Sequence, residues 1–299
     1  MDGKQLLYEL RQILNEDASS AFLDDRTSYK FLYDAAITLA SMTGVLTGTQ
    51  TITTVANQAN YQLNPDFLRI SLVDTGGKPM IKYTDSSNGV DWLSHTTRSE
   101  QIRANSTTSS RPSTFAVQSA TLNTRLTGSA TSSGAASNGE ATLTNTGANF
   151  TTVAPGDVVH NTTDGADGFV LSKTSNTVLS TALFGGSGND WQTNDSYVIQ
   201  PQGRFELYLD ATPDTSGETI TVPYVKRPDP VFSHFGAYPF PAQFSQALIC
   251  YSAWLYKYRD REPNYGDAFY KFWDLKMRES SAQSNSGLNR KLSVSLKGR

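Results

Sequence analysis

Residues 204–209 read Arg204-Phe205-Glu206-Leu207-Tyr208-Leu209, an alternation of apolar and polar side chains that is typical of a half-buried β-strand. Thr114–Gln118 has the same character, whereas the residues between Gln101 and Gln200 are rich in Ser, Thr, Gly, Asn and Ala and poor in charge. We therefore expect residues 119–202 to form a small all-β domain, inserted between two adjacent strands of one core.

The inserted segment is expected to be a barrel or a sandwich. It contains short alternating runs separated by turn signals such as Gly156-Asp157 and Asp164-Gly165. The runs are Ala141–Leu143, Val158–His160, Gly168–Leu171, Thr177–Leu179 and Tyr197–Ile199.

The surrounding core should contain further strands, because the period of its apolar residues is two. These predicted strands are Thr51–Val55, Tyr61–Leu63, Phe67–Val73, Pro79–Tyr83 and Thr219–Val225. We expect Thr219–Val225 to be the hairpin partner of residues 204–209, with Pro223 at an edge or a bulge. Val90, Trp92 and Leu93 predict a short helix that plugs the sheet.

Four amphipathic or apolar stretches predict helices, at residues 3–15, 27–42, 242–260 and 265–281. Asp2 can cap the first helix, and Gly44 can end the second. The expected fold class is α+β: a helical bundle of two N-terminal and two C-terminal helices, with a small antiparallel β core and an inserted all-β domain. The expected domains are a core of residues 1–118 and 203–283, the insertion 119–202, and an extended C-terminal tail 284–299.

Bulk composition excludes several classes of protein. The chain has 299 residues and a formal net charge of -3, which argues against a dedicated nucleic-acid-binding protein. Cys250 is the only cysteine and lies in an apolar helical run, so an internal disulfide is impossible. No segment is apolar enough for a transmembrane helix or a signal core, so we expect no membrane association and a reducing compartment.

Catalytic and metal sites are not expected. The three histidines are far apart and lack metal spacing, and Asp residues beside Gly are usual in turns. Calcium binding by Asp164, Asp167 and Asp190 lacks EF-hand spacing. We therefore predict no enzyme activity, no cofactor and no metal.

Aromatic residues surround the two C-terminal helices instead of forming one stripe, so more than one side must be covered. A neighbouring subunit and a single wide core are both compatible with this pattern. The predicted subunit-packing residues are Phe244, Tyr251, Trp254, Tyr258, Phe269, Phe272 and Trp273.

The C-terminal tail alternates strictly and carries basic flanks. An end that adds a strand to a partner's sheet explains this pattern, and a frayed end with a chance pattern explains it as well. The predicted docking residues are Arg290, Lys291, Leu292, Val294, Leu296, Lys297 and Arg299.

The order of these parts resembles the head-to-tail adaptor, or connector, proteins of tailed bacteriophages, a group that includes the tail-accessory adaptors of P22-like phages and the tubular adaptors of T7-like phages. The resemblance covers about residues 1–118 and 203–284. It lies in Asn60–Phe67, in Phe205–Leu209 followed by Arg227-Pro228, and in Phe240–Phe244 before the aromatic helices. Asn64 stands where the family commonly has Pro, and residues 119–202 are extra.

The resemblance implies a structural virion protein at the head-tail junction. Such adaptors form a ring of twelve subunits below the portal protein, contact tail or further connector proteins, and extend a channel through which double-stranded DNA passes without sequence-specific binding. C-terminal segments in the family often reach into the portal. The alternative is a glycan-binding or host-recognition virion protein that uses residues 119–202, with Trp191, Tyr197 and Phe184 stacking on sugars.

Overall fold

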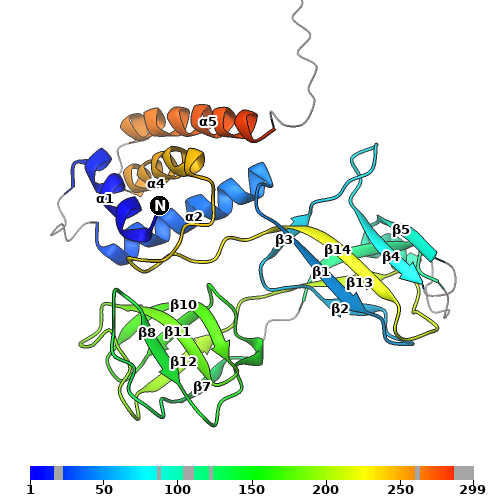
Figure 1. The fold of residues 1–299 in the computed structure, drawn as a ribbon, viewed down its shortest axis with the longest axis horizontal. Helices are drawn as coiled ribbons and strands as arrows, with labels where there is room; N and C mark the ends of the chain where they lie inside the picture. Colours follow the sequence, from blue (N-terminus) through cyan, green and yellow to red (C-terminus); the bar gives the residue numbers. More distant parts are fainter. Residues whose placement is uncertain (17–22, 86–88, 104–110, 121–123, 260–262, 286–299) are drawn as a thin grey trace, which may run out of the picture. The chain divides into compact units, whose positions relative to one another are not determined.

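The computed structural model describes residues 1–16, 23–85, 89–103, 111–120, 124–259 and 263–285. The chain divides into two compact units. The first, here the helical unit, contains Met1, Leu6–Leu39 and Phe240–Arg299; the second, here the β unit, contains Asp2–Gln5 and Ala40–Pro239 (Figure 1).

The N-terminal helices of the helical unit are α1 (Gly3–Leu14) and α2 (Asp25–Thr43), which confirms both predictions. The Asp2 carboxylate accepts the backbone N–H of Gln5 at 2.8 Å and caps α1. Gly44 has a φ of 62°, so it ends α2 in the left-handed conformation that glycine adopts without strain. An ion pair of 2.7 Å joins Arg11 of α1 to Asp25 of α2.

The C-terminal helices are α4 (Ser245–Arg259) and α5 (Pro263–Asn285), preceded by a short 3-10 helix, η2 (Ala242–Phe244). Both predicted helices are confirmed. Tyr256 of α4 donates its hydroxyl hydrogen to Glu16, which follows α1, at 2.7 Å. Helix α4 is buried on several sides, at Ala247, Leu248, Ile249, Cys250, Ser252, Ala253 and Tyr256.

The β unit contains an eight-stranded sheet whose strand order is β1-β14-β4-β5-β6-β13-β2, with β3 also paired to β14. Every described pair is antiparallel except β5 with β6. The strands are β1 (Thr47–Thr53), β2 (Asn60–Gln62), β3 (Phe67–Ile70), β4 (Met80–Asp85), β5 (Gly89–His95), β6 (Thr114–Ser119), β13 (Phe205–Leu209) and β14 (Thr219–Lys226). A short helix, α3 (Arg98–Arg103), follows β5.

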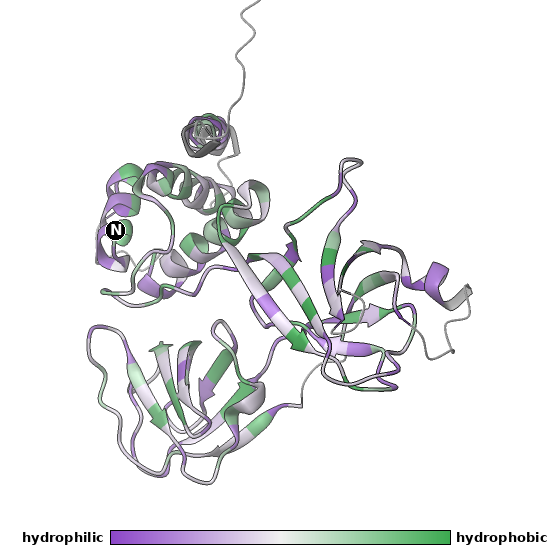
Figure 2. Ribbon diagram, turned by 45° about the vertical axis from the view of Figure 1, so that its right-hand side comes forward, coloured by the Kyte–Doolittle hydropathy of each residue, from purple (hydrophilic) through white to green (hydrophobic). Residues whose placement is uncertain are grey.

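One side chain links the two ends of this sheet. Gln50 of β1 donates its amide to the carbonyl of Gln62 at 3.0 Å and accepts the backbone N–H of Asn64 at 2.8 Å. The sheet is therefore curled, and its inner face encloses a core that includes Tyr61, Tyr83, Phe115, Leu207 and Ile220. Strands in Figure 2 alternate hydrophobic and hydrophilic residues, as expected for strands with one buried face.

Residues 126–200 form a second sheet, with strand order β7-β12-β9-β10-β11-β8. The N–H of Thr131 donates to the carbonyl of Thr144 at 2.7 Å, which brings the chain after β7 to β8 and closes the sheet into what we call the six-stranded barrel. Its strands are β7 (Leu126–Ser129), β8 (Ala141–Thr144), β9 (Val158–Asn161), β10 (Ala166–Ser175), β11 (Val178–Phe184) and β12 (Ser196–Gln200). A 3-10 helix, η1 (Phe150–Thr152), adds Phe150 to the barrel core.

The expected adjacency of the strands that flank the insertion is confirmed, because β6 and β13 pair with Ser119 opposite Phe205. The boundaries proposed for the domains, 118/119 and 202/203, stay a prediction.

The predicted fold class is wrong. The chain is 29% helical and 35% strand, and two curled sheets take the place of a helical bundle with a small β core. Val90, Trp92 and Leu93 belong to β5, so the predicted plug helix adds a strand instead. Val90 and Trp92 are exposed on one face of β5 and Leu93 is buried on the other, so these apolar residues are divided between the two faces of a strand and do not share one side of a helix.

The predicted hairpin is also wrong: β14 pairs with β1, β3 and β4, and β13 pairs with β2 and β6. Pro223 therefore lies in a central strand. Ser71 donates to its carbonyl at 3.0 Å, so the nitrogen of Pro223 faces the same side. On that side β14 changes its partner from β4 to β3, and a missing N–H costs little where no partner strand continues.

Candidate functional site

An aromatic cluster joins α4 to α5. Tyr251 and Trp254 of α4 lie 4.9 Å from Trp273 and 5.2 Å from Tyr270 of α5, respectively, measured between ring centroids. Tyr270 and Trp273 are themselves 4.9 Å apart. These distances are those of favourable aromatic pairs, so the cluster fixes α5 on α4.

The predicted subunit-packing residues divide into three groups by exposure. Phe244 and Trp273 are buried within the chain itself, and Tyr251, Trp254 and Phe269 are half-buried. Tyr258 and Phe272 are exposed. Contact of any of them with a second subunit stays a prediction, but only the exposed group is available without rearrangement.

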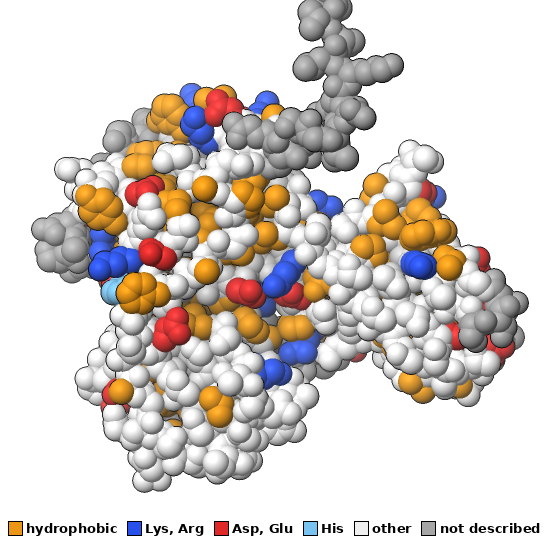
Figure 3. Space-filling model, viewed as in Figure 1, with side chains coloured by type: hydrophobic (Ala, Val, Ile, Leu, Met, Phe, Trp, Pro, Cys, Tyr) orange, Lys and Arg blue, Asp and Glu red, His pale blue; other side chains and the backbone are white. Residues whose placement is uncertain are grey.

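Exposed apolar residues continue along one side of α5. Phe272 is 56% exposed and Leu275 is 50% exposed, and Ala268 is one turn before Phe272. Residues three and four apart share a side of a helix, so these three form one stripe, which we call the α5 face. Figure 3 shows hydrophobic side chains at the surface in the region of α5. The polar side of α5 carries an ion pair between Asp274 and Arg278.

The predicted portal-docking residues, Arg290 to Arg299, lie outside the described residues.

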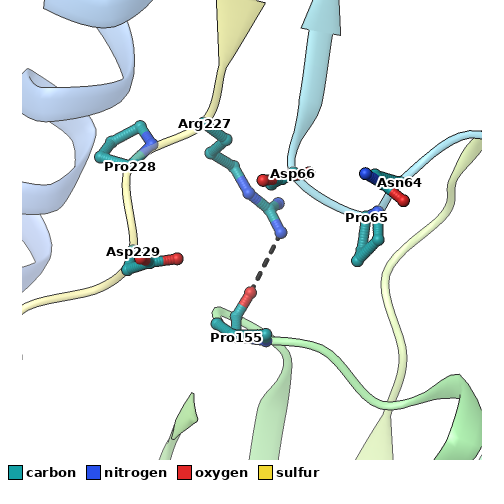
Figure 4. Close-up of a pocket in the computed structure, with 7 residues that line it drawn as sticks. All are labelled: Asn64, Pro65, Asp66, Pro155, Arg227, Pro228 and Asp229. Atoms are coloured by element: carbon teal, nitrogen blue, oxygen red, sulfur yellow. Dashed lines mark hydrogen bonds between the residues drawn. The ribbon is translucent and has the colours of Figure 1, made fainter. Parts of the chain in front are cut away.

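A pocket of about 250 Å³ lies within the β unit (Figure 4). It is lined by Asn64, Pro65, Asp66, Pro155, Arg227, Pro228 and Asp229. The Arg227 guanidinium points across it and donates to the carbonyl of Pro155 at 3.1 Å. Its carboxylates are engaged: Asp66 accepts the Tyr224 hydroxyl at 3.0 Å, and Lys226 lies 3.4 Å from Asp229. The residues that line the pocket therefore connect the chain after β14 to the barrel. Their charged groups are paired with one another or with neighbouring polar groups.

Two arginines surround a buried carboxylate beside this pocket. Asp157 accepts the backbone N–H groups of Ala154 at 2.8 Å and Gln202 at 2.9 Å. Burial raises the pKa of the Asp157 carboxyl, although these bonds and the charges of Arg204 and Arg227 act in the opposite direction. Burial likewise lowers the pKa of Arg204, which donates to the carbonyl of Thr152. The arrangement is a structural junction, and sequence analysis missed it.

The histidines are separated in the structure as they are in the sequence. His160 pairs with Asp167 across β9 and β10, whereas His95 lies 5.4 Å from the Phe115 ring. Among the described residues, no three His, Cys, Asp or Glu side chains are grouped to hold a metal ion. No helix in the same part of the chain is long and apolar enough to cross a membrane.

The carboxylates considered for calcium support loops of the barrel. Asn161 donates its side-chain amide to Asp164 and to Asp195, at 3.0 Å each, and to the Asp190 carbonyl at 3.2 Å. This network is internal to the loops.

Two of the rings predicted to stack on sugars are core residues. Trp191 is fully buried, and its indole N–H donates to the Thr181 hydroxyl at 2.9 Å. Tyr197 is buried too, and its hydroxyl accepts from Asn145 at 2.9 Å. Neither ring offers a face to a ligand, so the glycan-binding alternative keeps only Phe184, which is half-buried, of the three rings proposed for it.

Comparison of the sequence with protein-family models and with curated proteins finds no match.

Proposed function

We propose that this chain is a structural head-to-tail connector of a tailed phage virion, which forms a ring under the portal protein and provides the attachment platform for the tail. The observation that carries the proposal is the α5 face, where Ala268, Phe272 and Leu275 are exposed together. Large adjacent apolar side chains at a surface are typical of protein interaction sites. Aromatic side chains are also enriched at the cores of such interfaces.

The packing of α5 against α4 supports a role in assembly. Its aromatic side against α4 is fixed by Trp273 and Tyr270, so the α5 face is presented by a rigid helix. Rigid presentation lowers the entropy cost of association. A closed ring needs a repeated contact between neighbours, and the α5 face supplies one half of such a contact.

The proposed role of the chain toward DNA is passive. With a formal net charge of -3, the protein has few cations to replace the counterions of a DNA duplex. A channel built from such subunits would let DNA slide.

The ring is tested by native mass spectrometry of the full chain, alone and mixed with the portal protein of the same phage. The variant Phe272→Asp/Leu275→Asp should stay monomeric under conditions in which the natural sequence forms rings on the portal. Tyr8→Asp is the matched control, because Tyr8 is 63% exposed on α1 of the same unit. Rings of normal size from the double variant would contradict the role of the α5 face.

Portal docking by the C-terminal residues has its own test. A chain that ends at residue 286 should keep its circular dichroism spectrum and lose binding to the portal. Undiminished portal affinity of this truncated chain would refute docking by Arg290 to Arg299.

A further inference from the structure

The segment from Arg227 to Pro239, here called the strap, connects β14 to η2 and belongs to the β unit. It contains no helix or strand. Its side chains nevertheless contact the six-stranded barrel at successive points, which a simple linker would not do.

The central contact of the strap is aromatic. Phe232 is only 1% exposed, and its ring stacks on Phe169 of β10 with centroids 4.2 Å apart and planes 15° apart. The same ring meets Phe184 of β11 edge-on at 6.4 Å. Stacked and edge-on aromatic pairs at these distances are favourable beyond the area they bury.

The surface beneath Phe232 is the outer face of the barrel. Along β10, Ala166, Gly168 and Val170 are buried toward the barrel interior, so Phe169 between them points outward. Its register partner Ala182 has no exposed surface although it shares that outward direction. Phe169, Ala182 and Phe184 therefore form an apolar site on the outside of the barrel, and Phe232 occupies it.

Polar contacts hold the strap on both sides of Phe232. Before it, Arg227 donates to the Pro155 carbonyl at 3.1 Å. After it, Ser233 donates its hydroxyl to Glu140 at 2.6 Å, and the N–H of His234 donates to the Asn138 carbonyl at 3.1 Å.

The strap is also held by the N-terminal residues of the chain. The N–H groups of Gly3 and Lys4 donate to the carbonyls of Gly236 at 3.2 Å and His234 at 2.9 Å. A Cβ at Gly3 would lie 2.1 Å from the carbonyl oxygen of Ser233, so only glycine permits this approach. The strap thus contacts both the barrel and the start of the chain.

Opening of this contact would leave the core and the strand pairing of the barrel in place. The core of the barrel is a separate cluster that includes Phe150, Trp191 and Ile199, and Phe232 is not a member of it. The strap adds no strand to the barrel sheet, so its release would break no strand pairing of the barrel.

We propose that the strap is a releasable cover: Phe232 acts as an internal ligand of the Phe169–Ala182–Phe184 site, and its departure uncovers that site while freeing the segment that leads into η2 and α4. This inference concerns the β unit alone and does not depend on the ring. It assigns the inserted barrel a surface that the chain itself keeps closed.

The test is hydrogen exchange of the full chain, followed by mass spectrometry, for Phe232→Ala and Phe235→Ala. Phe235 is the matched control, because it lies in the same strap and is 62% exposed. Phe232→Ala should speed exchange of strap amides and of the Gly3 and Lys4 amides by roughly tenfold or more, since burial of a phenylalanine shifts a local opening equilibrium by such a factor. Amides of the barrel strands should keep their protection.

A variant on the barrel side removes any ambiguity from misfolding of the strap. Phe169→Ala should speed exchange of the same amides. The effect of the double variant should be smaller than the sum of the two single effects, because both substitutions remove the same stacked pair. Equal exchange in the Phe232→Ala and Phe235→Ala proteins would overturn the proposal. Loss of protection throughout the barrel would overturn it too, because Phe232 would then be part of the barrel fold.

Discussion

Tyr83 donates its hydroxyl hydrogen to the carboxylate of Glu218 inside the eight-stranded sheet, where both side chains are buried. Tyr83 comes from the inner face of β4, and Glu218 directly precedes β14. Burial of a carboxyl group lowers the free energy of unfolding unless the group is neutral or paired.

Glu218 should make stability depend on pH. Burial raises the pKa of its carboxyl in the folded protein. Below the pKa of the unfolded chain, about 4.3, the carboxyl is neutral in both states and costs nothing. As pH rises from there through the folded pKa, the unfolded chain ionises first, so the free energy of unfolding falls. Glu218→Gln keeps an acceptor for Tyr83 and should remove this loss.

The measurement is urea denaturation of both proteins between pH 4 and pH 8. The difference between their free energies of unfolding should be near zero at the acid end and should grow in favour of Glu218→Gln as pH rises. A difference that shrinks with pH would show that the folded pKa is lowered instead.

Gln50 should contribute more to the free energy of unfolding than an ordinary surface glutamine, because its two hydrogen bonds join opposite ends of the sheet. Gln50→Ala should lower the free energy of unfolding by about 1–3 kcal/mol, since each lost bond contributes about 1 kcal/mol. Gln58→Ala is the control, because Gln58 makes a local bond to the Asn60 carbonyl at 2.7 Å. Chemical denaturation compares the two, and equal losses would argue against a closing role.

Thr181 satisfies the buried indole of Trp191. Thr181→Val leaves that N–H without an acceptor and should cost about 1–3 kcal/mol, whereas Thr181→Ser retains the hydroxyl and should cost less. Thermal unfolding followed by near-ultraviolet circular dichroism distinguishes the variants. A Thr181→Val protein as stable as the natural one would mean that the indole finds another partner.

Gly168 allows β10 to approach β11 closely. A Cβ at this position would lie 1.8 Å from the carbonyl oxygen of Ala182, so Gly168→Ala must displace backbone. Such overpacking should lower stability by about 1–3 kcal/mol. Gly147→Ala serves for comparison, since its nearest contact would be 3.6 Å away, at the Asn145 side chain. Differential scanning calorimetry of both variants tests the contrast, which would vanish if the strands could simply separate.

Features that depend only on residues close in the sequence, such as helix ends and single strands, were predicted correctly. Asp2 and Gly44 mark real helix ends, and the alternation in residues 204–209 marks β13. Partners were not predictable in the same way. β14 is joined to β1 through a register that pairs Thr47 with Val225, and neither strand carries a mark of the other. Because the partners of each strand were not predicted, the strands outside the insertion were expected to form a small core, whereas they form an eight-stranded sheet.

The candidate site likewise combines features that the sequence predicted with contacts that it did not. The aromatic richness of α4 and α5 was visible in the sequence, but the helical period did not separate buried Trp273 from exposed Phe272 one residue earlier. The role of Arg227 depends on Pro155, which is far away in the sequence and belongs to the barrel. Only the folded chain shows this contact.

The barrel is entered from Ser119 and left toward Phe205, two residues that face each other across β6 and β13. A two-residue turn, the commonest connection of a β-hairpin, could bridge these positions. The surrounding sheet would then keep its pairing with the whole segment absent, and a different module could occupy the same place. Evolution could therefore exchange this appendage for another without redesigning the sheet that carries it.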